Sequence, residues 1–141
     1  MTKILVVEDD ENYLVTILRR LKPFFQAEGV PTLADAIRVF ASNGFKAVLL
    51  DIGLRDSPSE KTVRSMKIQY PNCAIVVLSG NEDPGRIRQC IQDSASSYLI
   101  KGRDDQNSEA LAAAIFSAIT SNDVCHKAER VQREIESGNE I

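Results

Sequence analysis

Short apolar runs alternate with segments of helical periodicity along most of this chain. The runs lie at residues 3–7, 24–30, 47–51, 74–78 and 97–100. A strand that is buried on both faces forms a nearly continuous apolar run, because helices cover both faces of a parallel sheet. The run at 24–30 is the least regular, since Gly29 interrupts it. Five strand-and-helix units in succession predict an α/β fold with one parallel sheet between two layers of helices.

Capping and stop residues bound the helical segments between these runs. We expect helices over roughly residues 11–21, from 33 to the Asn43-Gly44 pair, over 59–69, from 84 to about 93, and from 107 or 108 onward. Asp10 and Thr32 are N-cap residue types directly before the first two helices. Pro23 ends the first helix, and Pro84 suits the first turn of the fourth.

The length and charge of the chain restrict the class of protein. At 141 residues it fits one domain, and its net charge of −3 gives no electrostatic reason to bind nucleic acid or an anionic membrane. No apolar run approaches the ~20 residues of a membrane span, and the first strand begins too early for a signal peptide. Cys73, Cys90 and Cys125 show no CxxC spacing. We therefore expect a cytoplasmic protein with free thiols.

Four of the runs stop at a polar residue that can handle phosphate or a metal ion. Glu8 and Asp9 follow the first run, Asp51 ends the third, Ser79 follows the fourth, and Lys101 follows the fifth. Parallel strands have their carboxyl ends at one edge of the sheet, where open α/β sheets place their sites. We therefore expect these side chains to meet at that edge.

The residue types at this edge match the needs of phosphoryl transfer. The carboxylates of Glu8, Asp9 and Asp51 would repel one another without a cation among them, and such a set of oxygen ligands suits Mg²⁺. With that repulsion reduced, Asp51 can attack a phosphoryl group as a nucleophile. Lys101 and the Ser79 hydroxyl can each partner another phosphoryl oxygen. Taken singly, each residue also has an ordinary structural role, but their joint occurrence in order favours a shared site.

Together these residues resemble the receiver domain of bacterial two-component response regulators. The matching motifs are Ile4–Glu11, Val48–Asp51, Val77–Gly80 and Tyr98–Lys101, within a resemblance that covers about residues 3–120. The resemblance implies a flavodoxin-like (βα)5 sandwich with a five-stranded parallel sheet. It also implies that Asp51 accepts a phosphoryl group from a histidine kinase or a histidine phosphotransfer protein. Phosphorylation would then switch a surface that binds a downstream protein.

The resemblance assigns roles to neighbouring residues as well. Asp9 should bind Mg²⁺ directly, Glu8 should act through water, and the Gly53 carbonyl should be a further ligand. Ser79 should move toward the phosphate on activation, and Tyr98 should then turn inward, although a plain core aromatic is another interpretation of Tyr98. By the same resemblance the chain is not an enzyme, apart from catalysing its own phosphorylation and dephosphorylation.

Two loops depart from the family pattern. Arg55 stands where receivers commonly carry proline, and the glycine that usually follows is missing. The family pattern therefore does not predict the shape of the loop after Asp51. Gly102 follows Lys101 where the family has a cis proline. Because a non-proline cis bond costs about 2.5–4 kcal/mol, we expect a trans bond or a different local loop there.

Gly53 and Asn81 occupy positions through which receivers tune the access of water to the phosphoryl group. A glycine has no side chain to shield that group, so our hypothesis is a fairly rapid loss of phosphate. Asn81 is compatible with either role, because an amide can shield the phosphoryl group or position a water molecule.

The C-terminal end of the chain differs from the rest. We expect a receiver domain at residues 1–121 and a helical tail or linker at residues 122–141. The apolar residues of this tail recur at the spacing of one helical stripe, and they are Val124, Ala128, Val131 and Ile135. The stripe either packs on its own domain or forms a seam against a second copy, which would make a homodimer. No DNA-binding domain follows residue 121, so we expect no direct contact with nucleic acid.

Two alternative functions stay open at this point. A receiver-like docking module would keep the fold without being phosphorylated, although the intact set of site residues argues against it. A haloacid-dehalogenase-like phosphatase also uses Asp, Ser or Thr, Lys and Mg²⁺. Such enzymes, however, typically carry a DxD motif after the first strand, and its first Asp is the nucleophile. This chain has Glu8-Asp9-Asp10-Glu11 there and no cap domain for a substrate.

Overall fold

The structure, a computed structural model, describes residues 1–41 and 44–138 of the chain. Five strands form one sheet in the order β2-β1-β3-β4-β5, and every neighbouring pair is parallel. The strands are β1 Lys3–Val7, β2 Gln26–Val30, β3 Ala47–Leu50, β4 Ala74–Ser79 and β5 Ser97–Ile100. The short central strands are wholly buried, as their continuous apolar runs predict.

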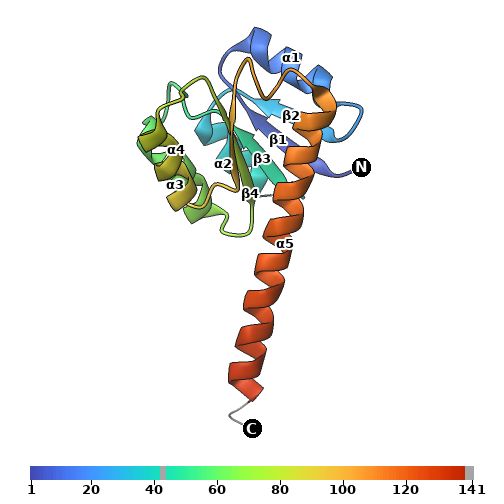
Figure 1. Cartoon of the computed structure of the whole chain (residues 1–141), viewed down its shortest axis with the longest axis vertical. Coiled ribbons are helices and arrows are strands. Elements are labelled where there is room, and N and C mark those ends of the chain that lie inside the picture. The colour runs from blue at the N-terminus through green and yellow to red at the C-terminus, as the bar shows by residue number, and fades with distance from the viewer. Residues whose placement is uncertain (42–43, 139–141) are drawn as a thin grey trace.

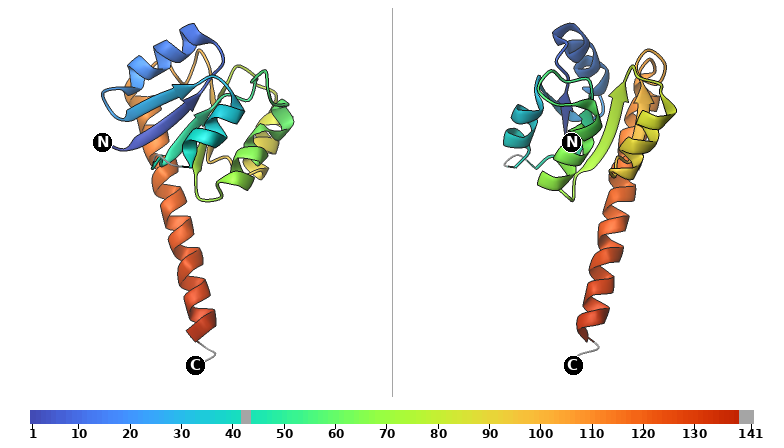
Figure 2. Two further views of the ribbon diagram at one scale, coloured as in Figure 1. Left: turned by 180° about the vertical axis from the view of Figure 1, so that it is seen from behind. Right: turned by 90° about the vertical axis from the view of Figure 1, so that its left-hand side faces the viewer.

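Helices cover both faces of this sheet (Figures 1 and 2). They are α1 Glu11–Leu21, α2 Leu33–Phe40, α3 Ser59–Gln69, α4 Pro84–Gln92 and α5 Ser108–Gly138. Contacts join α1 with α5 on one face, and α2 with α3 and α3 with α4 on the other. The arrangement confirms the flavodoxin-like (βα)5 fold with a five-stranded parallel sheet, and it leaves one helix, α5, much longer than the domain needs.

Alternation along the strands divides the core in two. Leu5, Val7 and Leu50 belong to the cluster under α2, α3 and α4. Ile4 and Leu49 belong to the other cluster, which α1 and α5 cover. Because successive side chains of a strand point to opposite faces, one apolar run supplies both cores. This two-sided burial holds the carboxyl ends of the strands in place.

The sequence-based element bounds are close, with small corrections. Asp10 caps α1 and Thr32 caps α2, as expected. The second strand begins at Gln26 rather than at residue 24, because Phe24 and Phe25 bond back to Leu21 in the turn after α1.

The ends of the other elements need similar adjustment. Helix α2 ends at Phe40, before the predicted Asn43-Gly44 stop; Asn43 lies outside the described residues. Strand β4 includes Ser79, and β3 ends just before Asp51. These small shifts leave the order of the elements unchanged.

The second part of α5 extends away from the domain (Figure 1). The helix buries Leu111, Ile115 and Ala118 against the sheet, but Val124 and Ile135 are 63% and 54% exposed. The interpretation in which the tail stripe packs on its own domain is therefore wrong. The reason is the length of α5, because residues 127–137 lie beyond the end of the domain and are exposed on every side of the helix. Val124, nearer the domain, follows Ile115 by about two and a half turns and so lies on the side of the helix that faces away from the sheet.

Two further expectations concern membranes and thiols. Among the described residues, the helices are too short or too polar to span a bilayer. All three cysteines have free thiols, with Cys73 and Cys90 buried and Cys125 exposed. The prediction of unpaired cysteines is thus confirmed.

Candidate functional site

Backbone hydrogen bonds continue the sheet past the ends of the strands and align the predicted site residues. The Asp51 amide donates to the Val7 carbonyl at 3.0 Å, which places Asp51 beside Glu8. The Lys101 amide donates to the Ser79 carbonyl, also at 3.0 Å. All four polar strand ends therefore lie at one edge of the sheet, as the sequence predicts.

Three carboxylates, which follow two neighbouring strands, lie close together at this edge of the sheet. One oxygen from each of Glu8, Asp9 and Asp51 can be chosen so that the three atoms lie within 4.8 Å of one another. Glu8 is 4% exposed and Asp51 is 7% exposed, so water screens them little. Carboxylate oxygens this close together, two of them from buried residues, are the ligand type of a hard divalent cation such as Mg²⁺. The donor set thus fits the cation that the family resemblance implies.

The electrostatics of Glu8 reflect this crowding. Burial and the neighbouring Asp51 carboxylate raise the pKa of Glu8 to about 7, and Lys101 opposes the shift only in part. A carboxyl group with this pKa is partly protonated at neutral pH. A cation placed among the three acids would remove the repulsion and drive that proton off.

Lys101 lies between the two buried carboxylates. Its Nζ is 3.1 Å from each oxygen of Glu8 and 3.5 Å from Oδ2 of Asp51. The peptide bond to Gly102 is trans, since the described chain contains no cis bond. Gly102 adopts φ +82°, a left-handed conformation that proline cannot reach and glycine adopts freely. A different local loop therefore replaces the family's cis proline.

Two acids that sequence reasoning did not place in the site hold this loop. The Ile100 amide donates to Asp104 Oδ2 at 2.7 Å, and the Gly102 amide donates to Asp105 Oδ1 at 2.8 Å. Asp105 is only 1% exposed. The available signal was two adjacent acids directly after the lysine loop, but their spacing alone does not reveal which amides they accept.

Tyr13 of α1 joins the same loop from the other side. Its hydroxyl donates a hydrogen bond to the Asp105 carboxylate, and its ring centroid lies 4.6 Å from the Lys101 Nζ. Burial and Asp105 raise the pKa of Tyr13, which keeps the hydroxyl protonated as a donor. Arg20 also donates to the Asp105 carbonyl at 2.9 Å. Helix α1 is thereby tied to the segment that carries Lys101.

The loop after Asp51 has a definite shape despite its departure from the family pattern. The Arg55 amide donates to Asp9 Oδ2 at 3.2 Å, a bond that a proline at this position could not make. The Asp56 carboxylate accepts from the Leu33 and Ala34 amides at 3.0 Å each, and so caps α2. The loop is thus bonded both to an acid of the cluster and to a neighbouring helix.

Gly53 lies directly beside the Asp51 side chain. Its amide donates to Asp51 Oδ1 at 3.0 Å. A Cβ atom added at Gly53 would lie 3.5 Å from the same oxygen, which is ordinary van der Waals contact. The glycine leaves this side of the carboxylate open, and a larger residue would cover it.

Ser79 and Tyr98 both hold the backbone of Asn81. The buried Ser79 Oγ accepts from the Asn81 amide at 3.1 Å, and the Tyr98 hydroxyl donates to the Asn81 carbonyl at 2.6 Å. The Tyr98 side chain is half-buried and packs against the core cluster of α2, α3 and α4. The two residues predicted to switch together therefore meet on one residue of the loop after β4.

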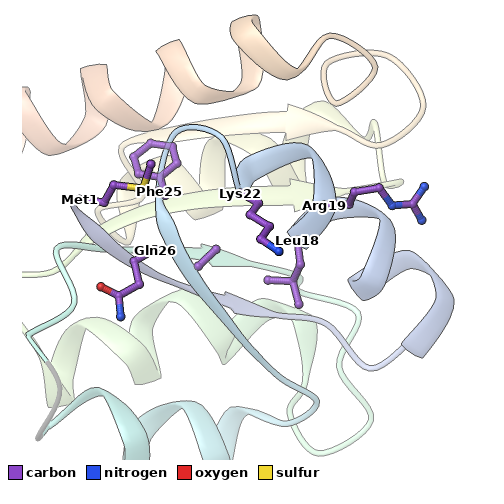
Figure 3. A pocket seen from close by; sticks show the side chains of 7 residues that line it. Met1, Leu18, Arg19, Lys22, Phe25 and Gln26 are labelled. Atoms are coloured by element: carbon purple, nitrogen blue, oxygen red, sulfur yellow. The ribbon is translucent and has the colours of Figure 1, made fainter.

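A pocket lies at the opposite edge of the sheet, near the start of the strands. It has a volume of about 730 Å³ and lies between α1 and the start of β2 (Figure 3). Its lining residues are Met1, Leu18, Arg19, Lys22, Phe25, Gln26 and Ala27. None of the predicted site residues lines this pocket. The candidate site is therefore the cluster of charged side chains at the carboxyl ends of the strands and not this pocket.

Comparison with known proteins identifies relatives of this chain. One curated relative is the photosynthetic apparatus regulatory protein RegA of Rhodovulum sulfidophilum, which is 27% identical over 115 residues. The match covers 81% of this chain and 61% of RegA, so the chain spans less than two thirds of that relative.

Solved structures of receiver domains share the fold. The BeF3-activated receiver domain of DrrB has a TM-score of 0.72 and 25% identity, and covers 85% of this chain and 98% of its own. The CheY-like receiver domain protein from Methanospirillum hungatei JF-1 has a TM-score of 0.77 and 18% identity, with 87% and 97% covered. A response regulator from Burkholderia pseudomallei with a phosphorylated aspartic acid has a TM-score of 0.72 and 20% identity, with 99% and 86% covered.

The family itself follows from a match along most of the chain. The family model of the response regulator receiver domain matches residues 4–115, a span that contains all four polar strand ends. This chain therefore belongs to the response regulator receiver domain family.

Proposed function

We propose that Asp51 is the phosphoacceptor of this receiver domain. The observation that carries the proposal is the position of its carboxylate, beside Glu8 and Asp9 and 3.5 Å from the Lys101 ammonium. A nucleophilic carboxylate needs a cation to offset its neighbours and a second positive charge for the incoming phosphoryl oxygens. The edge of this sheet supplies residues for both needs.

Asp9, Asp51 and the Gly53 carbonyl are the proposed direct ligands of Mg²⁺, with Glu8 acting through water. When bound, the cation would neutralise the acids and part of the phosphoryl charge. Arg55 supports the arrangement, because its amide holds one oxygen of Asp9 and thereby orients that carboxylate.

The transfer step is a displacement at phosphorus. An Asp51 oxygen forms the new P–O bond while the P–N bond to the donor histidine breaks, and the electron pair of that bond returns to the imidazole. Lys101 exchanges its contacts with Glu8 for a phosphoryl oxygen, and the Ser79 hydroxyl donates to another. The product is an aspartyl phosphate, which water later hydrolyses. We propose no enzymatic activity beyond these two self-catalysed reactions.

The phosphoryl donors would be a histidine kinase or a histidine phosphotransfer protein, and the output would be contact with a downstream protein. A hydroxyl that turns toward the phosphate gives up its bond from the Asn81 amide, and Tyr98 holds the carbonyl of the same residue. The loop after β4 is therefore the proposed two-state element, whose balance the phosphoryl group shifts. The proposed location of the protein is the cytoplasm.

The proposed division of the chain is a receiver at residues 1–121 and a tail at residues 122–141. In support, the buried positions of α5 end at Ala118 within the part of the chain that the structure describes. The tail carries the proposed contact with a second copy of the chain, and direct contact with nucleic acid is not part of the proposal.

The test is exposure of the protein to acetyl phosphate with Mg²⁺, followed by intact mass. We expect the mass of one added phosphoryl group. This addition should not occur when Mg²⁺ is chelated before the reaction, nor in the Asp51→Asn variant. Asp10→Asn is the matched control, because Asp10 is an exposed acid at the same edge that caps α1. No phosphorylation of the wild-type protein would instead favour a docking module. Repeated turnover of phosphate esters would favour a phosphatase.

A further inference from the structure

The second part of α5 carries an apolar stripe that its own domain leaves uncovered. This tail stripe consists of Val124, Ala128, Val131 and Ile135. Val124, Val131 and Ile135 are 63%, 44% and 54% exposed, and the helix is continuous through all four positions. The spacing of four, three and four residues is that of a coiled-coil seam, in which the partner is another helix.

We propose that the tail stripe pairs with the tail stripe of a second copy in antiparallel orientation. Val124 then faces Ile135 of the second copy, and Ala128 faces its Val131. The inference gives the proposed tail contact an orientation and a register, and it does not depend on phosphate transfer to Asp51.

The register is self-complementary. In an antiparallel pair each seam position meets one residue of the other helix, and the four tail-stripe residues form two kinds of layer, each occurring twice. Every apolar residue of one stripe is covered by an apolar residue of the other. A two-fold axis between residues 129 and 130 relates the two copies, so the contact closes as a dimer.

Charges beside the seam favour the same orientation. Lys127 precedes Ala128 and Glu134 precedes Ile135, so both residues flank the tail stripe on one side. In the antiparallel register, Lys127 of each copy lies beside Glu134 of the other, which makes two equivalent ion pairs. In a parallel register Lys127 would instead meet the uncharged Gln132.

The distribution of charge along the whole tail also favours antiparallel pairing. Residues 123–133 hold three bases and two acids, whereas residues 134–137 hold the acids Glu134 and Glu136 and no base. Antiparallel pairing brings the acidic end of one tail to the more basic part of the other. Parallel pairing would place the two acidic ends together, where they repel.

The contact is short, which determines its strength. Isolated helices of this length are marginal in water, because nucleation of the first turn is unfavourable. Here the packed first part of α5 supplies that nucleus, since Leu111 and Ile115 are fixed against the sheet. We therefore expect a weak, concentration-dependent monomer–dimer equilibrium rather than a permanent dimer.

The first test is a charge swap measured by sedimentation of the full, unphosphorylated chain. Lys127→Glu and Glu134→Lys should each weaken dimerisation by about tenfold, because each places like charges in both pairs. The double variant Lys127→Glu/Glu134→Lys should restore it. Glu129→Lys is the control, since Glu129 contacts Cys125 and His126 of its own helix rather than the seam. Circular dichroism of each variant shows whether the helix is retained.

The second test locates the register by disulfide formation in a Cys125→Ser background. Val124→Cys combined with Ile135→Cys should cross-link two copies on oxidation, whereas Val124→Cys alone should not. In the antiparallel pair the two copies of residue 124 lie about 16 Å apart, too far for a disulfide.

Three results would overturn the proposal. They are a monomer at every concentration, single variants that the double variant fails to rescue, and cross-linking by Val124→Cys alone. All measurements use unphosphorylated protein, so their outcome is separate from that of the acetyl phosphate experiment.

Discussion

The hydroxyl of Tyr13 donates a hydrogen bond to the carboxylate of Asp105, 92 residues further along the chain. Asp105 also accepts the Gly102 amide, and the Tyr13 ring lies 4.6 Å from the Lys101 Nζ. One aromatic side chain thus contacts both Lys101 and the acid that shapes the loop behind it. In this protein these contacts hold the segment that a cis proline shapes in other receivers.

Removal of the Tyr13 ring should slow phosphorylation of Asp51. In Tyr13→Leu, Lys101 loses its aromatic partner, and we expect about a tenfold lower rate with acetyl phosphate, the effect of losing a partly buried cation–π contact. Tyr13→Phe keeps the ring and loses only the hydroxyl, so its rate should fall less. The rate is followed by intact mass, with thermal unfolding as a check on the fold. Equal rates for Tyr13→Leu and the wild type would contradict this role.

Gly102 should be intolerant of a side chain. Its φ of +82° is left-handed, so Gly102→Ala should lower the free energy of unfolding by about 1–2 kcal/mol. Gly80→Ala is the matched control, because Gly80 has ordinary φ and a Cβ there would meet nothing within 4 Å. Urea denaturation measures both variants. A loss as large in Gly80→Ala as in Gly102→Ala would show that the backbone conformation is not the cause.

Stabilisation by Mg²⁺ should increase with pH. The pKa of Glu8 is raised from 4.5 to about 7 in the folded protein, so between these values the folded state binds more protons than the unfolded state. The contribution of Glu8 to stability without metal is therefore full below pH 4.5 and is lost as the pH rises through 7. Because Mg²⁺ favours the ionised acid, it restores stability at high pH.

The measurement is the melting temperature with and without Mg²⁺ at about pH 5.5 and about pH 8. We expect the larger Mg²⁺-dependent increase at the higher pH. Glu8→Gln cannot titrate, so the pH dependence that Glu8 causes should disappear in that variant. A Mg²⁺ effect of the same size at both pH values in the wild type would refute the assignment.

Gly53→Arg should prolong the lifetime of the aspartyl phosphate. A side chain at this position begins 3.5 Å from Asp51 Oδ1, close enough to restrict the approach of water. Gly53→Ala adds only the Cβ atom and should have a smaller effect. The decay of phosphorylated protein is followed after removal of acetyl phosphate. An unchanged or shorter lifetime in Gly53→Arg would count against shielding at this position.

Local pattern predicted most of the fold. The apolar runs of β3 and β4 are buried strands, and the bounds of α1 and α3 agree with the predicted helices. These elements depend on periodicity and on caps such as Asp10, which are properties of neighbouring residues. Errors arose at Phe24, whose amide bonds back to Leu21 in the turn after α1, and at Ser79, which pairs with Ile100 and so extends its strand.

The sequence predicted those site residues that directly follow a strand. Asp51 and Lys101 follow their strands directly, and the parallel order of the strands brings them together. Tyr13 and Asp105 were missed because they belong to a helix and a loop far apart in the chain, and no local pattern connects them. The bond from the Arg55 amide to Asp9 was missed for the same reason.

The tail shows the same division. The sequence by itself determined that Val124, Ala128, Val131 and Ile135 share one side of a helix, because helical periodicity is a local property. Only the tertiary structure decided that this side faces solvent, since that depends on where α5 leaves the sheet, and the last buried residue in the described part of the helix is Ala118. The apolar runs, the helix caps and the residue types at the strand ends were thus local information. The lysine loop, the Asp9 orientation and the exposed stripe depend on contacts between distant segments, which form only when the chain is packed.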